Sequence, residues 1–228
     1  MTFADFEQEN KLSFKNKDLL QQAFIHRSYL NENRHKGLEH NERLEFLGDA
    51  VLELAVTDFL YHKYPQTAEG DLTAYRSALV NYVMMAEVAQ SLGVNDLMLL
   101  SKGESRDTGR ARQVILADAM EAIIGAIYLD SGYETAEQFV AKLLYSKIDE
   151  VVKNKLWLDS KTRLQEQAQE RVSITPSYKI LQEVGPDHDK KFIVGVYLKD
   201  ELVAEGEGKS KQEAEQEAAK KALVVKGW

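Results

Sequence analysis

Apolar residues recur at helical spacing through the first two thirds of the chain. Between about residues 16 and 153 they repeat three and four residues apart, and only Pro65 of the three prolines interrupts them. Short polar stretches divide this region at residues 35–37, 65–70 and 101–110. The pattern predicts helices over residues 14–29, 41–64, 72–92, 111–129 and 133–152. We therefore expect an all-α fold here.

The pattern changes after Lys155. Residues 160–171 favour a helix, and Pro176 ends it. Residues 178–184 and 192–198 then alternate between apolar and polar side chains, which predicts two strands. A turn cluster over residues 185–189 separates the two strands, and a third strand is predicted through Leu202 and Ala204.

The chain closes with a predicted helix over residues 210–226, in which Ser210 and Glu213 have the spacing of a capping box. The order α-β-β-β-α predicts an antiparallel sheet in an α+β domain. We expect a helical domain over residues 3–133, its last helix and a linker over 134–157, and the α+β domain over 158–228.

Two acidic residues lie where the first long helix should be apolar. Glu45 and Asp49 are four residues apart and share one helix face, and the same stripe continues into Leu52 and Val56. The opposite side is apolar as well, so this helix is expected to be largely buried. Carboxylates in such surroundings are costly unless a cation or hydrogen-bond donors compensate them.

A second helix repeats this pattern. Asp118 and Glu121 are the only charged residues between positions 114 and 129, and they also share a face. Gly48 lies beside the first acidic pair, and Gly125 lies beside the second. Small residues at these positions would let the two helices approach closely and bring all four carboxylates to one point.

The donor types restrict the chemistry of such a site. The chain has no cysteine, so a metal ion would need oxygen or nitrogen ligands. Converging carboxylates suit Mg²⁺ or Mn²⁺, which activate water and stabilise charge during phosphoryl transfer. The alternative for each acidic pair taken alone is that it caps a helix, forms ion pairs or faces solvent.

The composition of the chain excludes several classes of protein. Hydrophobic residues make up 44% of the chain and charged residues 29%, as in ordinary globular proteins. No stretch has the length and hydrophobicity of a membrane span, and the first residues lack the features of a signal peptide. With no cysteine, the chain is expected to be cytoplasmic. No Gly-x-x-x-x-Gly-Lys-Ser/Thr loop occurs, so no nucleotide cofactor is expected.

Several motifs resemble those of bacterial ribonuclease III. Residues 40–49, His-Asn-Glu-Arg-Leu-Glu-Phe-Leu-Gly-Asp, resemble the signature of that family, and residues 116–122, Leu-Ala-Asp-Ala-Met-Glu-Ala, resemble its second acidic motif. Residues 26–29 and 69–72 match lesser motifs. The resemblance covers almost the whole chain, with the catalytic domain in the helical part.

The resemblance implies a homodimeric endoribonuclease that cuts both strands of double-stranded RNA with metal-activated water, leaving staggered ends with 5′-phosphate and 3′-hydroxyl groups. It further implies Mg²⁺, with Mn²⁺ as a substitute, and a role in processing ribosomal precursor and messenger RNA. Four residues match the metal-binding carboxylates: Glu45, Asp49, Asp118 and Glu121. Asp49 and Glu121 match the catalytic pair.

Three further positions of the helical domain are carried over from the family. Glu42 and Glu69 match acidic positions that line its cleft, although an ion pair with a neighbouring arginine is the alternative for Glu42. Phe46 matches a residue that plugs into the partner subunit. On the helical wheel Phe46 falls beside Glu42 and Glu53, and an exposed aromatic there favours an interface anchor over a core residue.

The last part of the chain resembles a double-stranded-RNA-binding domain. Residues 161–166, 185–192 and 206–223 match its first helix, its β1–β2 loop and its last helix. The RNA-binding residues expected from this match are Thr162, Gln165, Glu166, His188, Lys209, Ser210 and Lys211.

Their chemistry agrees with RNA binding. Lys209 and Lys211 lie at a helix N-terminus, where backbone N–H groups favour phosphate, and Gln165 can reach 2′-hydroxyl groups. Many relatives have a basic residue where this chain has Gln212, so a lower affinity is expected. The net charge of −8 argues against indiscriminate binding of polyanions. A non-cutting protein that binds double-stranded RNA is the alternative function, and the intact carboxylate set disfavours it.

Overall fold

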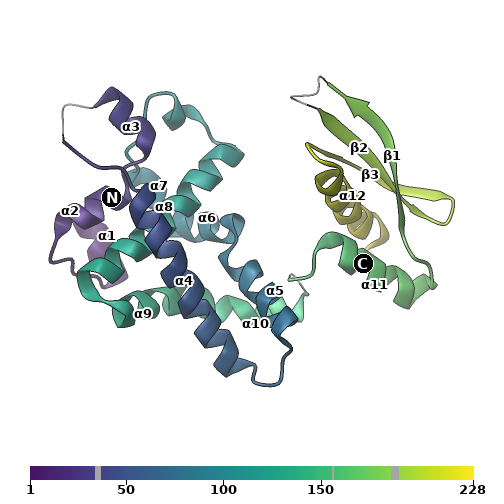
Figure 1. Cartoon of the computed structure of the whole chain (residues 1–228), viewed down its shortest axis with the longest axis horizontal. Helices are drawn as coiled ribbons and strands as arrows, with labels where there is room; N and C mark the ends of the chain where they lie inside the picture. Colours follow the sequence, from purple (N-terminus) through teal and green to yellow (C-terminus); the bar gives the residue numbers. More distant parts are fainter. Residues whose placement is uncertain (34–36, 156, 186–189) are drawn as a thin grey trace. The chain divides into compact units, whose positions relative to one another are not determined.

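The computed structural model describes residues 1–33, 37–155, 157–185 and 190–228. These residues form two compact units, 1–154 and 155–228. The first is entirely helical, and the second is a three-stranded antiparallel sheet with two helices (Figure 1). The predicted fold class is thus confirmed. The finer domain limits, at residues 133 and 157, stay predictions. Among the described residues, no helix is long and apolar enough to cross a membrane.

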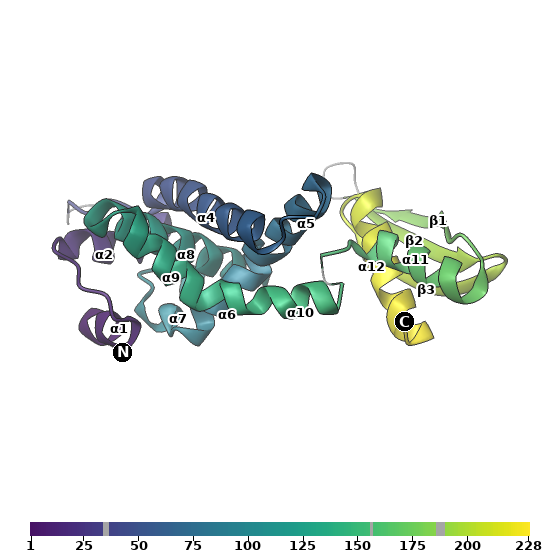
Figure 2. The same cartoon turned by 90° about the horizontal axis from the view of Figure 1, so that it is seen from below.

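The first unit is built around two long helices, α4 and α8, which lie side by side (Figure 2). Its helices are α1 Phe3–Asn10, α2 Lys17–Ala23, α3 Arg27–Glu32, α4 Glu42–Lys63, α5 Glu69–Val80, α6 Tyr82–Ser91, α7 Val94–Leu97, α8 Arg110–Ser131, α9 Tyr133–Leu144 and α10 Ile148–Lys153. The helices predicted over residues 41–64 and 111–129 are confirmed as α4 and α8. Their facing stripes supply much of the core, including Leu52, Val56 and Ile123.

The single helix predicted over residues 14–29 is wrong, because the chain breaks between α2 and α3. Ile25 forms a short parallel bridge with Leu99. The backbone N–H of His26 donates to the carbonyl of Leu99 at 3.1 Å, and the N–H of Leu99 donates to the carbonyl of Phe24 at 2.9 Å. The segment around Leu99 therefore forms hydrogen bonds with backbone groups that would otherwise bond within a continuous helix.

The helix predicted over residues 72–92 is also two helices, α5 and α6. Asn81 between them has an extended backbone, and its side chain accepts hydrogen bonds from Val83 N at 3.1 Å and Met84 N at 3.0 Å. An asparagine that caps the next helix ends the previous one. The helix predicted over residues 133–152 is likewise divided by a 3-10 turn, Tyr145–Lys147, into α9 and α10.

The second unit contains α11 Ser160–Val172, β1 Ser177–Val184, β2 Lys191–Leu198, β3 Glu201–Gly208 and α12 Lys211–Lys226. The sheet order is β1-β2-β3, and both pairs are antiparallel, as predicted. Helix α12 packs closely on β3 because Gly206 has no side chain: a Cβ there would overlap the backbone of Ala214 and Ala218. Leu164 of α11 and Val196 of β2 complete this core.

The predicted capping box at Ser210 is confirmed on one side only. The Ser210 hydroxyl oxygen accepts a hydrogen bond from Glu213 N at 3.1 Å. The Glu213 carboxylate, however, accepts from the backbone N–H of Lys209 at 2.9 Å, one residue before the cap. The start of α12 is therefore fixed from both sides, and this orders the segment that carries the predicted phosphate-binding lysines.

Candidate active site

The two acidic helices touch at glycines. A Cβ on Gly48 of α4 would overlap the backbone of Glu121, and a Cβ on Gly125 of α8 would overlap the carbonyl oxygen of Leu44. Only glycine permits this backbone-to-backbone contact. The close approach predicted from the sequence is confirmed, and it occurs at the level of the acidic pairs.

The contact brings the four predicted carboxylates into one electrostatic group. Burial raises the pKa of Glu121 to about 8, and the charges of Asp49, Asp118 and Glu45 add to the shift. Burial likewise raises the pKa of Glu45 to about 7, with Asp118, Glu42 and Asp49 adding. The pKa of Asp118 is raised by burial and by the charge of Glu42. Glu45, Asp118 and Glu121 thus resist ionisation because they are partly buried and because like charges lie close by.

The expectation that α4 is buried nearly all round is wrong. Asp49 and Ala50 are exposed, and Leu54 is 56% exposed. Neighbouring elements cover only the stripe through Leu52 and Val56. The four acids therefore lie at the border between core and solvent, where Asp49 is open and the other three are partly buried. Solvent can reach this border directly.

The donor set fits a hard divalent cation, although the side chains do not form a ready-made cage. Among the described residues, no group of three or more histidine, aspartate or glutamate side chains is arranged to hold a metal ion. Burial and, after it, the charges of neighbouring acids raise the pKa of Glu45 and Glu121, and a bound cation would offset this cost of ionisation. Mg²⁺ commonly binds one or two carboxylates directly and keeps several waters, so a compact cage is not required.

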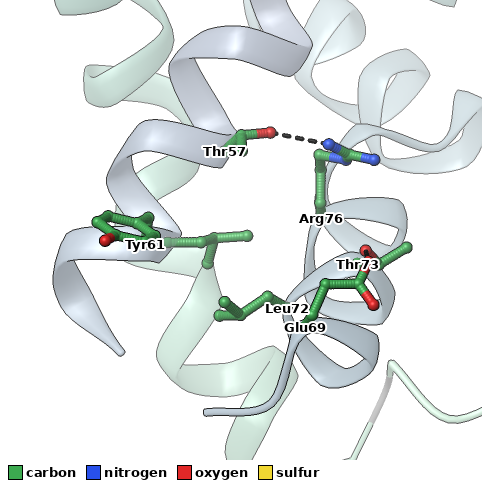
Figure 3. Close-up of a pocket in the computed structure, with 7 residues that line it drawn as sticks. Thr57, Tyr61, Glu69, Leu72, Thr73 and Arg76 are labelled. Carbon is green, nitrogen blue, oxygen red and sulfur yellow. Dashed lines mark hydrogen bonds between the residues drawn. The ribbon is translucent and has the colours of Figure 1, made fainter. Parts of the chain in front are cut away.

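Glu42 and Glu69 lie in different places. Glu42 accepts a hydrogen bond from Arg27 Nη1 at 3.3 Å, the ion pair proposed as its alternative, and its charge also acts on Glu45 and Asp118. Glu69 begins α5 and accepts from Thr73 Oγ1 at 3.1 Å, in a pocket between α4 and α5 (Figure 3). Glu42 stands at the edge of the acidic group, and the structure does not bring Glu69 into it. The cleft role of both residues stays a prediction.

Phe46 is 81% exposed on α4, so the predicted exposure is confirmed. Beside it lies a surface hollow of about 560 Å³, whose walls include Gln22, His40 and Leu129. An exposed aromatic next to a hollow of this size could pair with the same surface of a second copy. Its role in dimerisation stays a prediction.

The predicted RNA-binding residues of α11 are exposed. Thr162 donates to Asp159 Oδ2 at 2.7 Å, and Glu166 accepts from Lys155 Nζ at 3.1 Å. Gln165 lies between them on the same helix, with its side chain open to solvent.

The predicted residues at the start of α12 are also exposed. The Lys211 ammonium lies 4.0 Å from Glu183 Oε1 and 5.7 Å from the centre of the Phe192 ring. This weak surface pair leaves Lys211 able to exchange its partner for a phosphate. His188 lies outside the described residues.

Both units of the chain are similar to known proteins. A family model described as Ribonuclease-III-like matches residues 16–148, and one described as Double-stranded RNA binding motif matches residues 160–225. Ribonuclease 3 of Pelotomaculum thermopropionicum is 49% identical over 213 residues, which cover 93% of this chain and 88% of that protein. Ribonuclease 3 of Bacillus licheniformis is 48% identical over 222 residues, covering 97% and 89%.

The chain belongs to the ribonuclease III family. The nuclease domain of ribonuclease III from Campylobacter jejuni matches 64% of this chain and 97% of its own, with a TM-score of 0.58 and 43% identity. The resemblance inferred from the acidic motifs is confirmed. As a member of this family with a double-stranded-RNA-binding domain, the chain is an endoribonuclease for double-stranded RNA.

Sequence reasoning missed one acidic residue of this ribonuclease III site. The charge of Glu53 contributes to the raised pKa of Glu121. Glu53 follows Asp49 by four residues on α4, so the same spacing rule that grouped Glu45 with Asp49 would have found it. The acidic surface of α4 is therefore one residue longer than the motif indicates.

Proposed function

We propose that this chain hydrolyses phosphodiester bonds on both strands of double-stranded RNA with water activated by Mg²⁺, and that Mn²⁺ substitutes for it. The backbone contact at Gly48 and Gly125 carries the proposal, because it holds Glu45 and Glu121 in one negative group and raises the pKa of both. Strongly shifted carboxyl groups in an accessible position are typical of functional sites.

The four acids have distinct surroundings. Glu45, Asp49, Asp118 and Glu121 would hold the cation, which when bound supplies a nucleophilic water and neutralises charge on the attacked phosphate. Asp49 and Glu121 are the two carboxylates that we place next to the reacting phosphate. Asp49 is exposed and therefore meets the substrate, whereas Glu121 is fixed by the helix contact.

The products follow from which bond breaks. The water oxygen joins phosphorus and the P–O3′ bond breaks, so one fragment keeps a 5′-phosphate and the other a 3′-hydroxyl. The described part of each chain holds one such group of four acids, so cutting both strands at one place requires two chains. A homodimer in which Phe46 enters the hollow beside His40 of a second copy would supply them.

The second unit supplies affinity in this proposal. Its exposed residues at the start of α11 and α12 offer hydroxyl, amide and ammonium groups for 2′-hydroxyls and phosphates. Ribosomal precursor and messenger RNA in the cytoplasm are the substrates that we expect.

Cleavage of a long RNA duplex tests the proposal. The wild type should cut in Mg²⁺ and stop cutting when a chelator is added. Glu121→Gln should lower the cleavage rate by about 10³-fold or more, because it removes a charged ligand at the reacting phosphate. It should still bind duplex RNA with wild-type affinity in Ca²⁺. If the wild-type protein binds the duplex but does not cut it in Mg²⁺ or Mn²⁺, the non-cutting alternative is favoured.

A further inference from the structure

A pocket of about 270 Å³ lies between the second half of α4 and α5. Its walls are Thr57, Leu60, Tyr61, Glu69, Leu72, Thr73 and Arg76. Figure 3 shows Thr57 and Arg76 facing each other across one end of the pocket, with Leu72 below them. The pocket therefore combines an apolar floor with one cationic group at its edge.

The guanidinium of Arg76 is held but not neutralised. Its Nη1 donates to Thr57 Oγ1 at 2.9 Å, and among the described residues no carboxylate forms an ion pair with it. Glu69, the one carboxylate in the pocket wall, is hydrogen-bonded to Thr73 instead. Arginine has five N–H donors in a planar fork that matches phosphate. In a chain of net charge −8, such a cation is available for an anionic ligand.

The pocket continues the surface that carries the acidic group. Asp49, Glu53, Thr57 and Tyr61 follow one another on α4 at intervals of four residues, and Glu53 still acts on Glu121. Four residues of α-helix rise about 6 Å, so Thr57 lies about 12 Å along the helix from Asp49. A duplex that presents one phosphate to the acids has further phosphates within this distance, because backbone charges recur every few ångströms.

Tyr61 completes the pocket on the α4 side. Its side chain is 67% exposed at the wall of the pocket. The flat ring and the leucine floor can receive a ribose while Arg76 binds its phosphate.

We propose that Arg76, positioned by Thr57, binds a backbone phosphodiester of the duplex close to the one being cut, and that this pocket is a ribose-phosphate subsite of the catalytic unit. The proposal rests on the proposed function, since it takes double-stranded RNA as the substrate. Arg76 touches substrate without taking part in bond breaking, and Thr57 is a positioning residue.

Binding measured against salt in Ca²⁺ tests the subsite without requiring cleavage. Full-length wild type, Arg76→Gln and Arg76→Lys are titrated with one long RNA duplex. Arg76→Gln should weaken binding and reduce the slope of log affinity against log salt by about 0.9 for each phosphate that the protein no longer neutralises. Arg76→Lys should keep the wild-type slope, because it keeps the charge. Lys142→Met, which removes a cation of α9 outside the pocket, should keep both slope and affinity.

Cleavage then separates binding from chemistry. Arg76→Gln should raise the RNA concentration needed for half-maximal cutting in Mg²⁺ and leave the single-turnover rate at saturating RNA within about twofold. Thr57→Val should weaken binding less than Arg76→Gln and keep the wild-type slope. A folded Arg76→Gln protein with wild-type salt slope would overturn the subsite. If Arg76→Gln lowers the melting temperature, the Arg76→Lys variant decides: a lowered salt slope for Arg76→Lys would also overturn the subsite. Failure of the wild type to cut would reject the proposed function and leave this binding result standing.

Discussion

The acidic group of the first unit and the RNA-binding surface of the second hold their charges in opposite ways. Glu45 and Glu121 are partly buried among like charges, and their raised pKa values show that ionising them is costly. Several lysines of the second unit lie beside opposite charges near solvent, as Lys211 does with Glu183 and Lys155 with Glu166. The charge that we propose for catalysis is thus held in place by backbone packing, whereas the charge that we propose for RNA binding is exposed and free to exchange partners.

Among substitutions outside the four acids themselves, the largest effect is expected from breaking the packing that concentrates them. Gly48→Ala places a methyl group into the backbone of Glu121, so α4 and α8 must move apart. Overpacking of this kind costs about 1–3 kcal/mol of unfolding free energy. A displacement of about 1 Å at a reacting group can lower the cleavage rate about 10²-fold. Thermal melting and cleavage of duplex RNA measure the two effects.

Gly70→Ala is the matched control for this substitution. Gly70 lies in α5, and a Cβ there meets no atom within 4 Å. The change should leave cleavage intact and stabilise the helix slightly, since alanine is the better helix former. Equal damage by both substitutions would show that the helix contact has no special role.

Phe46→Asp separates the single chain from the proposed dimer. If Phe46 anchors the interface, its removal should raise the dimer dissociation constant by about 30-fold or more, as expected for a central aromatic contact. Sedimentation should then show monomers, and cutting of both strands should become uncoupled. Val224→Asp, at a valine of α12 that is 78% exposed, is the control and should remain dimeric. If Phe46→Asp still forms a dimer with wild-type affinity, Phe46 is not the anchor of the interface.

A smaller effect is expected from Lys211→Ala. Because the ion pair of Lys211 with Glu183 is a weak surface contact, removing the lysine should not destabilise the second unit. Affinity for all duplex sequences should fall, and the salt slope should drop by about 0.9. A weakening confined to one sequence, with an unchanged slope, would show that Lys211 does not contact phosphate.

The sequence predicted the parts of the site that depend on local spacing. Glu45 and Asp49 share a face because they are four residues apart, and Gly48 with Gly125 correctly predicted a close helix contact. The strands of the second unit were also predicted, because a period of two is a local property. The capping pattern of α1 was equally local but was missed: Thr2 Oγ1 accepts from Asp5 N, and the Asp5 carboxylate accepts from Thr2 N.

Features that depend on distant segments were not predictable. The break before α3 exists because Leu99 pairs with Ile25, and no pattern near residue 25 reveals that partner. The exposure of Leu54 depends on which helices cover α4, so an apolar sequence wrongly indicated burial. The pocket at Arg76 requires a helix pairing, α4 with α5, that periodicity alone does not specify.

We expect the carboxyl group of Glu121 to stay protonated until a cation binds, because burial and the charges of neighbouring acids raise its pKa. The release of protons on metal binding measures this state of Glu121 directly. With a pKa of about 8, Glu121 is mostly protonated at pH 7, and Glu45, with a pKa of about 7, is about half protonated. Mg²⁺ binding must displace these protons.

Calorimetric titration of the metal-free protein with Mg²⁺, in two buffers of different ionisation enthalpy, counts the protons released. We predict roughly one proton or more per site at pH 7, a release that falls towards zero above pH 9, and a smaller release for Glu121→Gln. Mg²⁺ binding at pH 7 with the same heat in both buffers would contradict the account.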